Sequence, residues 1–304
     1  MLRRIGFGLA ACAAGVMAAV GGPALAEEYD MATGDADTGL WELTVTPYAW
    51  FTGVSGDIKA GGRKFDINAS FIDIVQESDW IIPLMGHAQA KKDRFSIFTD
   101  GFYTQMQFTK KQLVTLTPLQ GPIADPIVKF KNKLTLTQTL AFAEFDVGYE
   151  VAEWDQGPLG MSTLEILAGA RYWYGDVDAR LKVDRTVKLP NLGLKQKKNT
   201  AYIKSGSQDW VDPVVGIRVN QTFSEGRQLQ FLGDIGGFGV GSEFTWQVFA
   251  GYNHFTPIGN GNTLFATTIG YRAIGFDYDV GSGSNAQSYD LVLHGPIAGL
   301  SLRW

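Results

Sequence analysis

The feature that most constrains this sequence is a period-two alternation of apolar residues with polar or very small ones. It recurs in ten segments after Trp41. In the clearest segment, Val211 and Val215 alternate with Asp212 and Arg218. Successive side chains of a β-strand lie on opposite faces of the sheet. Each segment is therefore predicted to be a strand with one face in an apolar medium and the other in a polar one.

The segments and the connections between them follow a regular plan. The predicted strands lie at residues 41–51, 80–90, 94–109, 141–151, 164–174, 211–220, 229–235, 244–253, 265–272 and 291–304. Most connections alternate between short ones, near residues 92–93, 155–160, 224–227 and 256–260, and long ones, at 52–79, 110–133, 186–207 and 280–288. Membrane barrels have short turns at one end and long loops at the other. The plan therefore predicts an all-β fold, an antiparallel up-and-down transmembrane β-barrel of about ten strands.

The first long connection contains its own structural signals. Residues 55–68 predict a β-hairpin centred on Gly61-Gly62. If this hairpin joins the wall, the barrel has twelve strands. Ser70 is a suitable N-cap for a short amphipathic helix that runs to Val75. We expect this helix across the mouth of the barrel or inside its lumen.

The last segment changes phase along its length. Leu300 and Leu302 belong to its outward face, but upstream of Gly295-Pro296 the outward set becomes Leu291 and Leu293. A slip of one residue is what a β-bulge produces, and proline is tolerated at such a site. The sequence therefore predicts a bulge at this position.

The first 26 residues have the layout of a secretory signal peptide. Arg3 and Arg4 precede an apolar stretch at 5–20, and the small-residue triplet Ala24-Leu25-Ala26 follows. A retained transmembrane helix needs about 20 apolar residues, more than this stretch offers. We expect cleavage of residues 1–26, a periplasmic N-terminal segment at 27–40 and an outer-membrane barrel at 41–304 in a Gram-negative bacterium.

The charge balance and the single cysteine exclude several kinds of chemistry. Cleavage removes Cys12, the only cysteine of the chain, and with it any disulfide, thiolate metal site or cysteine nucleophile. The whole chain has 26 Lys and Arg against 31 Asp and Glu; loss of Arg3 and Arg4 leaves 24 against 31, a formal charge of −7. We therefore expect no nucleic-acid partner.

A soluble β-sandwich or lipocalin-like barrel is the competing interpretation, with its apolar face turned inward. The polar faces carry many charges beside glycine, and Tyr and Trp occur near strand ends, as at a lipid interface. Trp304, preceded by Leu302 and Leu300, also resembles the terminal aromatic signal of barrels delivered to the outer-membrane assembly machinery. These features favour the membrane barrel.

Several strings resemble a known family. They are Ala168-Gly-Ala-Arg-Tyr-Trp-Tyr174, Asp209-Trp-Val-Asp-Pro-Val-Val-Gly216, Gly233-Asp-Ile-Gly-Gly-Phe-Gly-Val-Gly241, Thr245-Trp-Gln247, Gly270-Tyr-Arg272 and His294-Gly-Pro296. Together they resemble a widespread proteobacterial family of small outer-membrane β-barrel proteins, usually labelled only hypothetical. The resemblance runs from about Trp41 to Trp304. It implies a location and a fold, and no established activity comes with it.

The alternation directs many ionisable side chains into one narrow lumen. This predicted charge network comprises Glu42, His87, Asp100, Glu144, Asp146, Glu165, Arg171, Asp212, Arg218, Asp234 and Arg272. Such charges must pair or stay hydrated. The network either fills the barrel as a structural core or lines a narrow, porin-like path for small solutes. Wide aqueous channels appear only at about 16 to 18 strands.

Catalytic signals are weak. His294 lies within conceivable reach of Asp277 on the preceding strand, so an acid-base pair acting on outer-membrane lipid or peptide is the enzymatic alternative. The chain has no Gly-x-Ser-x-Gly elbow, no His-Glu-x-x-His metal pair and no phosphate loop. We therefore expect no enzyme, no cofactor and no metal.

Basic residues gather in two of the predicted external loops. They are Lys110, Lys111, Lys129, Lys131 and Lys133, and later Lys182, Arg185, Lys188, Lys195, Lys197, Lys198 and Lys204. They are expected to bind lipopolysaccharide phosphates, to attract anions to a pore mouth, or to form only a solvated loop face.

Overall fold

The computed structural model describes residues 41–60, 62–116, 127–189, 194–223, 226–259, 263–282 and 286–304. The predicted signal peptide at 1–26 and the segment at 27–40 lie outside this part of the chain. None of the helices that it contains is long and apolar enough to cross a membrane.

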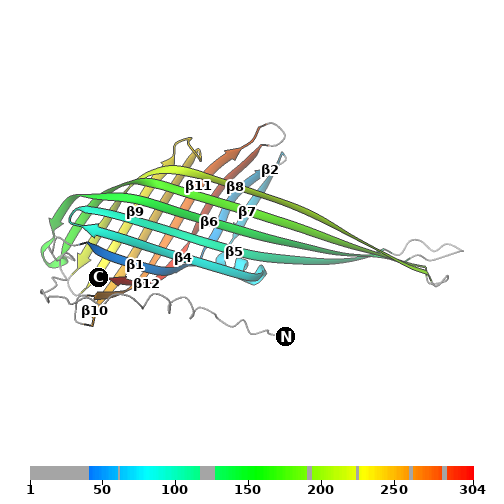
Figure 1. Cartoon of the computed structure of the whole chain (residues 1–304), viewed down its shortest axis with the longest axis horizontal. Helices are drawn as coiled ribbons and strands as arrows, with labels where there is room; N and C mark the ends of the chain where they lie inside the picture. Colours follow the sequence, from blue (N-terminus) through cyan, green and yellow to red (C-terminus); the bar gives the residue numbers. More distant parts are fainter. Residues whose placement is uncertain are drawn as a thin grey trace.

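The described chain is almost entirely β-structure. Its elements are β1 (Glu42–Trp50), β2 (Gly53–Ala60), β3 (Arg63–Ala69), α1 (Phe71–Glu77), β4 (Ser78–Lys92), β5 (Phe95–Leu116), β6 (Ile127–Asp155), η1 (Gly157–Leu159), β7 (Met161–Leu189), β8 (Leu194–Phe223), β9 (Arg227–Gly237), β10 (Phe244–Ile258), β11 (Thr263–Val280) and β12 (Gln287–Arg303). The twelve strands form one antiparallel sheet, and pairing of β1 with β12 closes ten of them into a ring (Figure 1). The predicted up-and-down barrel is confirmed.

The predicted hairpin forms and joins the sheet. Trp50 of β1 lies opposite Ile297, and Gly53 of β2 lies opposite His294, so both strands follow β12 in one continuous register. The backbone N–H of Phe51 bridges the two strands by donating to the carbonyl oxygen of Pro296 over 2.9 Å. The strand β3 then pairs with β2. Ten strands thus close the ring, and the hairpin brings the sheet to twelve.

The predicted phase slip in β12 is wrong. Pairing of β12 with β11 continues through Gly295 and Pro296 without a shift. Leu293 is 2% exposed, and Leu291 packs against the same buried cluster, so both point into the barrel. The interior of the barrel at this level is apolar, so a leucine occurs there on the inward face. From the sequence alone, such a leucine cannot be distinguished from one on the outward face.

The predicted short helix is present as α1. The Ser70 hydroxyl accepts a hydrogen bond from the backbone N–H of Asp73, and the Asp73 carboxylate accepts one from the backbone N–H of Ser70, which completes a capping box. The helix contacts β2, β3 and β4 and has no buried residue. In the described chain β3 pairs only with β2 and does not pair with β4. The helix α1 connects these two strands, so it lies at the side of the barrel rather than in the lumen.

The outer wall carries the large apolar side chains. Phe145, Ile166 and Val215 are about half exposed, whereas their inward neighbours Glu144 and Glu165 are almost fully buried. This arrangement is opposite to that of a soluble barrel, in which the apolar face is enclosed.

Two of the predicted short connections, at 92–93 and 155–160, are confirmed and lie at one end of the barrel. The other two, at 224–227 and 256–260, lie partly outside the described residues, and residues 256–258 belong to β10. This short-turn end also holds Trp41 and Trp304, and the backbones of Leu43 and Trp304 are hydrogen-bonded to each other. At the opposite end, β9 and β10 are joined by the short connection 238–243.

Large parts of two predicted long loops are instead strands. Of the residues assigned to loops at 110–133 and 186–207, residues 110–116, 127–133, 186–189 and 194–207 belong to β5, β6, β7 and β8, which are 22, 29, 29 and 30 residues long. Residues 117–126 and 190–193 lie outside the described part of the chain. A strand needs only about 9 to 11 residues to cross a membrane. The four strands remain paired far beyond β4 and β9 and form a tapering extension (Figure 1). We call residues 110–116, 127–135, 180–188 and 195–204 the blade.

Candidate functional site

The lumen is organised in three successive layers. Along β5, Phe98 lines a cavity, Asp100 belongs to a charged layer, and Phe102 belongs to an aromatic cluster. The same order recurs along β7, where Arg171 is followed by Trp173. Because inward positions alternate along each strand, the three layers succeed one another from the short-turn end toward the blade.

Arg171 is the most enclosed cation of the charged layer. It is completely buried, and its Nε lies 2.5 Å from Glu144 Oε2 while its second terminal nitrogen lies 2.8 Å from Asp234 Oδ1. It also donates to the Thr245 hydroxyl over 3.3 Å. One guanidinium therefore holds two carboxylates from different strands.

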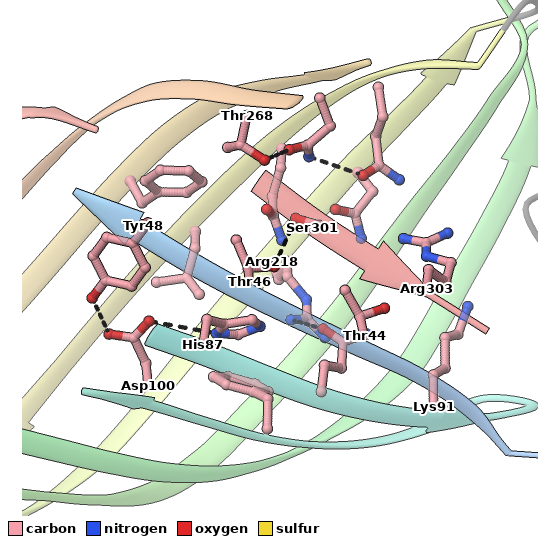
Figure 2. Close-up of a pocket in the computed structure, with 18 of the residues that line it drawn as sticks. Thr44, Thr46, Tyr48, His87, Lys91, Asp100, Arg218, Thr268, Ser301 and Arg303 are labelled. Atoms are coloured by element: carbon pink, nitrogen blue, oxygen red, sulfur yellow. Dashed lines mark hydrogen bonds and ion pairs between the residues drawn. The ribbon is translucent and has the colours of Figure 1, made fainter. Parts of the chain in front are cut away.

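Arg272 forms a second centre near β1. It donates to Asp100 Oδ1 over 2.7 Å and to the Tyr48 hydroxyl over 3.1 Å. His87 Nδ1 lies 3.5 Å from the other oxygen of the same carboxylate, and Figure 2 shows Tyr48, Asp100 and His87 in this chain of contacts. The guanidinium carbon lies 4.9 Å from the centre of the Phe142 ring, which places the charge beside the aromatic cluster.

Arg218 forms the third centre, beside the cavity. It is 2.5 Å from Glu165 Oε2, and it donates to Gln89 over 2.9 Å and to the Ser96 hydroxyl over 3.2 Å. Its guanidinium carbon also lies 4.8 Å from the centre of the Phe98 ring. All three buried arginines of the predicted network therefore have acidic partners.

Gln247 joins the first two centres. Its side-chain oxygen accepts from Arg272 Nε over 2.7 Å, and its nitrogen donates to Asp234 over 2.8 Å and to Glu144 over 3.5 Å. The sequence places Gln247 on an inward face but gives no sign of this bridging role. An amide is suited to it because one end accepts and the other donates.

Three other members of the predicted network lie outside these centres. Asp146 is buried next to the layer, and its Oδ2 has no hydrogen-bond partner within the described residues. Asp212 accepts from Trp210 Nε1 and from the backbone N–H of Ser242, so it secures the connection between β9 and β10. Glu42 lies 3.2 Å from Arg303 at the short-turn end.

An aromatic cluster fills the lumen on the blade side of the charged layer. Its buried members are Trp50, Phe102, Phe142, Trp173, Ile274, Phe276, Leu293 and Ile297. The Trp173 ring is fully buried, with its centroid 5.4 Å from that of Phe142 and 4.9 Å from that of Phe276. The sequence predicts a polar, largely filled lumen in which only Phe98 and Phe102 interrupt the polar inner face, so the extent of this apolar part is a correction.

A polar cavity of about 210 Å³ occupies the lumen at the short-turn end. Thr44, Thr46 and Ser301 line it (Figure 2). Amide side chains such as those of Asn220 and Gln228 complete the lining. Asp100, Glu144 and Arg272 form its inner end, so the cavity meets the charged layer there.

The predicted catalytic pair is not assembled. His294 Nδ1 lies 2.8 Å from the Tyr271 hydroxyl, in an exposed contact. On the β-ladder, His294 faces Ala273, whereas Asp277 faces Asp290, four residues further along. At about 3.4 Å per residue the two side chains are separated by roughly 14 Å along the strands. This distance is too long for direct proton transfer.

The fold and the lumen thus define an antiparallel β-barrel with an apolar outer wall and a filled interior. No family model matches the sequence, and a comparison with curated proteins found no match. The predicted family resemblance therefore stays a prediction.

Among solved structures, the matches include outer-membrane barrels. Ail of Yersinia pestis is 9% identical, over 87% of this chain and 98% of Ail, with a TM-score of 0.22. A FadL homologue of Pseudomonas aeruginosa is 8% identical, over 87% and 90%, with a TM-score of 0.25. The translocator domain of the autotransporter NalP from Neisseria meningitidis is 10% identical, over 87% and 88%, with a TM-score of 0.26. Scores this low carry no functional argument.

Proposed function

We propose that this chain is an outer-membrane β-barrel with a closed lumen, which acts as a membrane-embedded structural protein rather than as an open channel. The observation that carries the proposal is the filling of the lumen by two successive layers. Arg171 and Trp173 are both completely buried, two residues apart on β7. A solute that entered the cavity would meet the ion pairs first and the aromatic rings next.

The membrane location is supported by the outer wall. Ile269, Phe145, Tyr149 and Ile217 are all more than half exposed on the outer surface of the ring. Exposed apolar side chains on every second residue of paired strands are unfavourable in water and favourable in lipid. The layout of residues 1–26 supports export, and Trp304 supports recognition by the assembly machinery.

Planar-bilayer recording tests the closed lumen. The mature protein, refolded in detergent and added to a bilayer in 1 M KCl, is expected to give no stepwise conductance. Steady conductance steps of constant size, whose number rises with protein concentration, would show an open path and would favour the narrow-channel alternative. The same preparation, assayed with lipid A and peptide substrates, is expected to show no hydrolysis.

Cell fractionation tests the location independently of the lumen. The expressed chain is expected to sediment with the outer membrane and to begin at Glu27 by intact-mass measurement. Recovery of the protein in the soluble periplasmic fraction would refute the membrane assignment.

A further inference from the structure

The blade concentrates the positive charge of an otherwise acidic chain. Its basic residues are Lys110, Lys111, Lys129, Lys131, Lys133, Arg180, Lys182, Arg185, Lys188, Lys195, Lys197, Lys198 and Lys204, and its only acidic residue is Asp184. These are thirteen of the 26 Lys and Arg of the whole chain, against one of its 31 Asp and Glu. The blade thus has a formal charge of +12, while the rest of the chain has −17, which together give the total of −5.

Most of this charge lies on one face of the blade. Lys111, Lys133 and Lys182 are directly opposite one another on β5, β6 and β7. Each lies an even number of residues from an exposed outer-wall residue of its own strand, namely Tyr103, Phe145 and Tyr172 respectively. Because side chains alternate along a strand, the three lysines lie on the outward face of the sheet.

The other face of the blade is largely apolar. The neighbouring row places Lys110 opposite Leu134, followed by Leu181 and Tyr202 on the next two strands. A further row places Phe130 opposite Arg185, whose guanidinium carbon is 6.0 Å from the centre of the Phe130 ring. Four of the thirteen basic residues belong to this inward face, and nine belong to the outward face.

Like charges that face each other across strands destabilise a sheet. Neighbouring strands are about 5 Å apart, so Lys111, Lys133 and Lys182 hold three positive charges within roughly 10 Å. In the described chain no acidic residue lies in this row, since the next position on β8 is Ala201. The neighbouring carboxylates are those of Asp79, beside Gln107, and of Asp184, opposite Lys131, so two acidic groups stand near three lysines. The arrangement favours a bound anion that bridges several ammonium groups.

The position of this row indicates the source of the anion. Lys111 follows Tyr103 by eight residues, or roughly 27 Å along the strand. A strand tilt of about 40° reduces this to a height of about 20 Å above the apolar wall. Sugars, rather than acyl chains, surround a barrel at that height.

We propose that the outward face of the blade binds the phosphorylated core sugars of lipopolysaccharide in the outer leaflet. This inference rests on the proposed membrane location. Phosphate and carboxylate groups of these sugars neutralise the lysines that face them. The acyl chains of the same glycolipid contact the outer wall of the barrel, and the outward face of the blade continues this wall into the sugar layer. The blade thereby anchors the barrel in the sugar layer of the leaflet.

The test uses the triple variant Lys111→Gln, Lys133→Gln, Lys182→Gln. The full mature protein is refolded in uncharged detergent, and its affinity for lipopolysaccharide with a phosphorylated core is measured by thermophoresis at 0.15 M salt. Each lysine near an anionic surface contributes on the order of a fivefold change in affinity, so the variant is expected to bind at least roughly tenfold more weakly. Unchanged affinity in a folded variant overturns the proposal.

The matched control removes the same charge from the opposite face through Lys110→Gln, Lys198→Gln, Lys204→Gln. These three lysines are exposed and belong to the same blade. The control is expected to bind like the unmodified protein. An equal loss in both variants would indicate general attraction to polyanions, and would overturn the assignment to the outward face.

Two further ligands identify the part of the glycolipid that is bound. Lipopolysaccharide that has been chemically dephosphorylated, and soluble inorganic polyphosphate, are titrated under the same conditions. The phosphorylated form is expected to bind more tightly than either. Tighter binding of polyphosphate would point to a free external polyanion and overturn the glycolipid assignment.

Failure of the membrane location can be recognised separately. Cell fractionation and a heat-modifiable gel shift report whether the barrel is inserted and folded, and neither depends on the lysines. Protein that fractionates as soluble refutes the proposed function. Inserted protein whose outward-face variant keeps full affinity refutes only this inference.

Discussion

Arg171→Met tests whether the charged layer is structural. Methionine keeps most of the side-chain volume but removes the guanidinium that lies 2.5 Å from Glu144 and 2.8 Å from Asp234. Both carboxylates are almost fully buried, and Asp146 adds a third carboxyl group nearby. Removal of one partner from a buried ion pair costs about 3 to 5 kcal/mol, because the remaining charge is left without compensation. We expect a loss of stability in that range.

Refolding into phospholipid vesicles across a urea titration, followed by tryptophan fluorescence, measures this loss. Lys182→Met is the matched control, because it removes an exposed cation from the blade and should change stability by no more than about 0.5 kcal/mol. A second change, Asp234→Asn, made together with Arg171→Met, should recover part of the loss. If Arg171→Met costs less than about 1 kcal/mol, water screens these carboxylates and the lumen is not closed at this layer.

Three further substitutions probe the wall, a close approach in the lumen and the aromatic cluster in the same titration. Val215→Arg places a charge on the lipid side and is expected to cost about 2 to 4 kcal/mol, whereas a negligible loss would mean that the faces are reversed. Gly216→Ser should cost about 1 to 3 kcal/mol, because a Cβ atom there would lie 2.6 Å from the carbonyl oxygen of Gly233; unchanged stability would contradict this close contact. Trp173→Ala empties a fully buried site and should cost about 3 to 5 kcal/mol, and retention of full stability would argue against a packed cluster.

The barrel could be predicted because the alternation of apolar and polar residues recurs in many of its strands. A strand with one face against lipid and the other against a polar lumen places apolar and polar side chains at alternating positions, as Val211 and Asp212 do. The inward direction of the charges followed from the same rule. Gly216 shows the limit of this rule. Its place on the inward face suggests that a small polar substitution is tolerated there, whereas the close approach of Gly233 depends on the pairing of β8 with β9.

The partners of the charges could not be read in the same way. Alternation gives the face of a residue but not its level in the barrel, which depends on strand register and shear. Arg272 contacts Asp100 and Tyr48, which are far from it in sequence, and Gln247 connects the two arginine centres. The sequence places Phe102 on the inner face, but it does not predict a cluster, because the rule expects polar residues at inward positions such as that of Trp173.

The sequence analysis does not predict the blade, because it assigns the stretches between the alternating segments to loops. Lys133 and Leu134 alternate as strictly as residues of the barrel, but with the polarity of the two faces exchanged. On β7 the same exchange makes Leu181 inward and Lys182 outward. A rule that looks for apolar residues on one constant face therefore loses these strands where they leave the membrane.

This exchange of polarity can itself locate the outer boundary of the membrane. Along β7, the inward face runs from Glu165 through Arg171 and Trp173 to Leu181, while the outward face runs from apolar Ile166 to charged Lys182. The inward face becomes apolar before the outward face becomes charged, so the interior is sealed below the level at which the wall leaves the lipid. A single strand thus borders a cavity lined largely by polar residues, a set of ion pairs, an aromatic cluster and a basic outer layer. Residues of one face lie at every second position of a strand, and their type changes as their surroundings change along it. Both faces must therefore be followed together to separate the barrel from the blade.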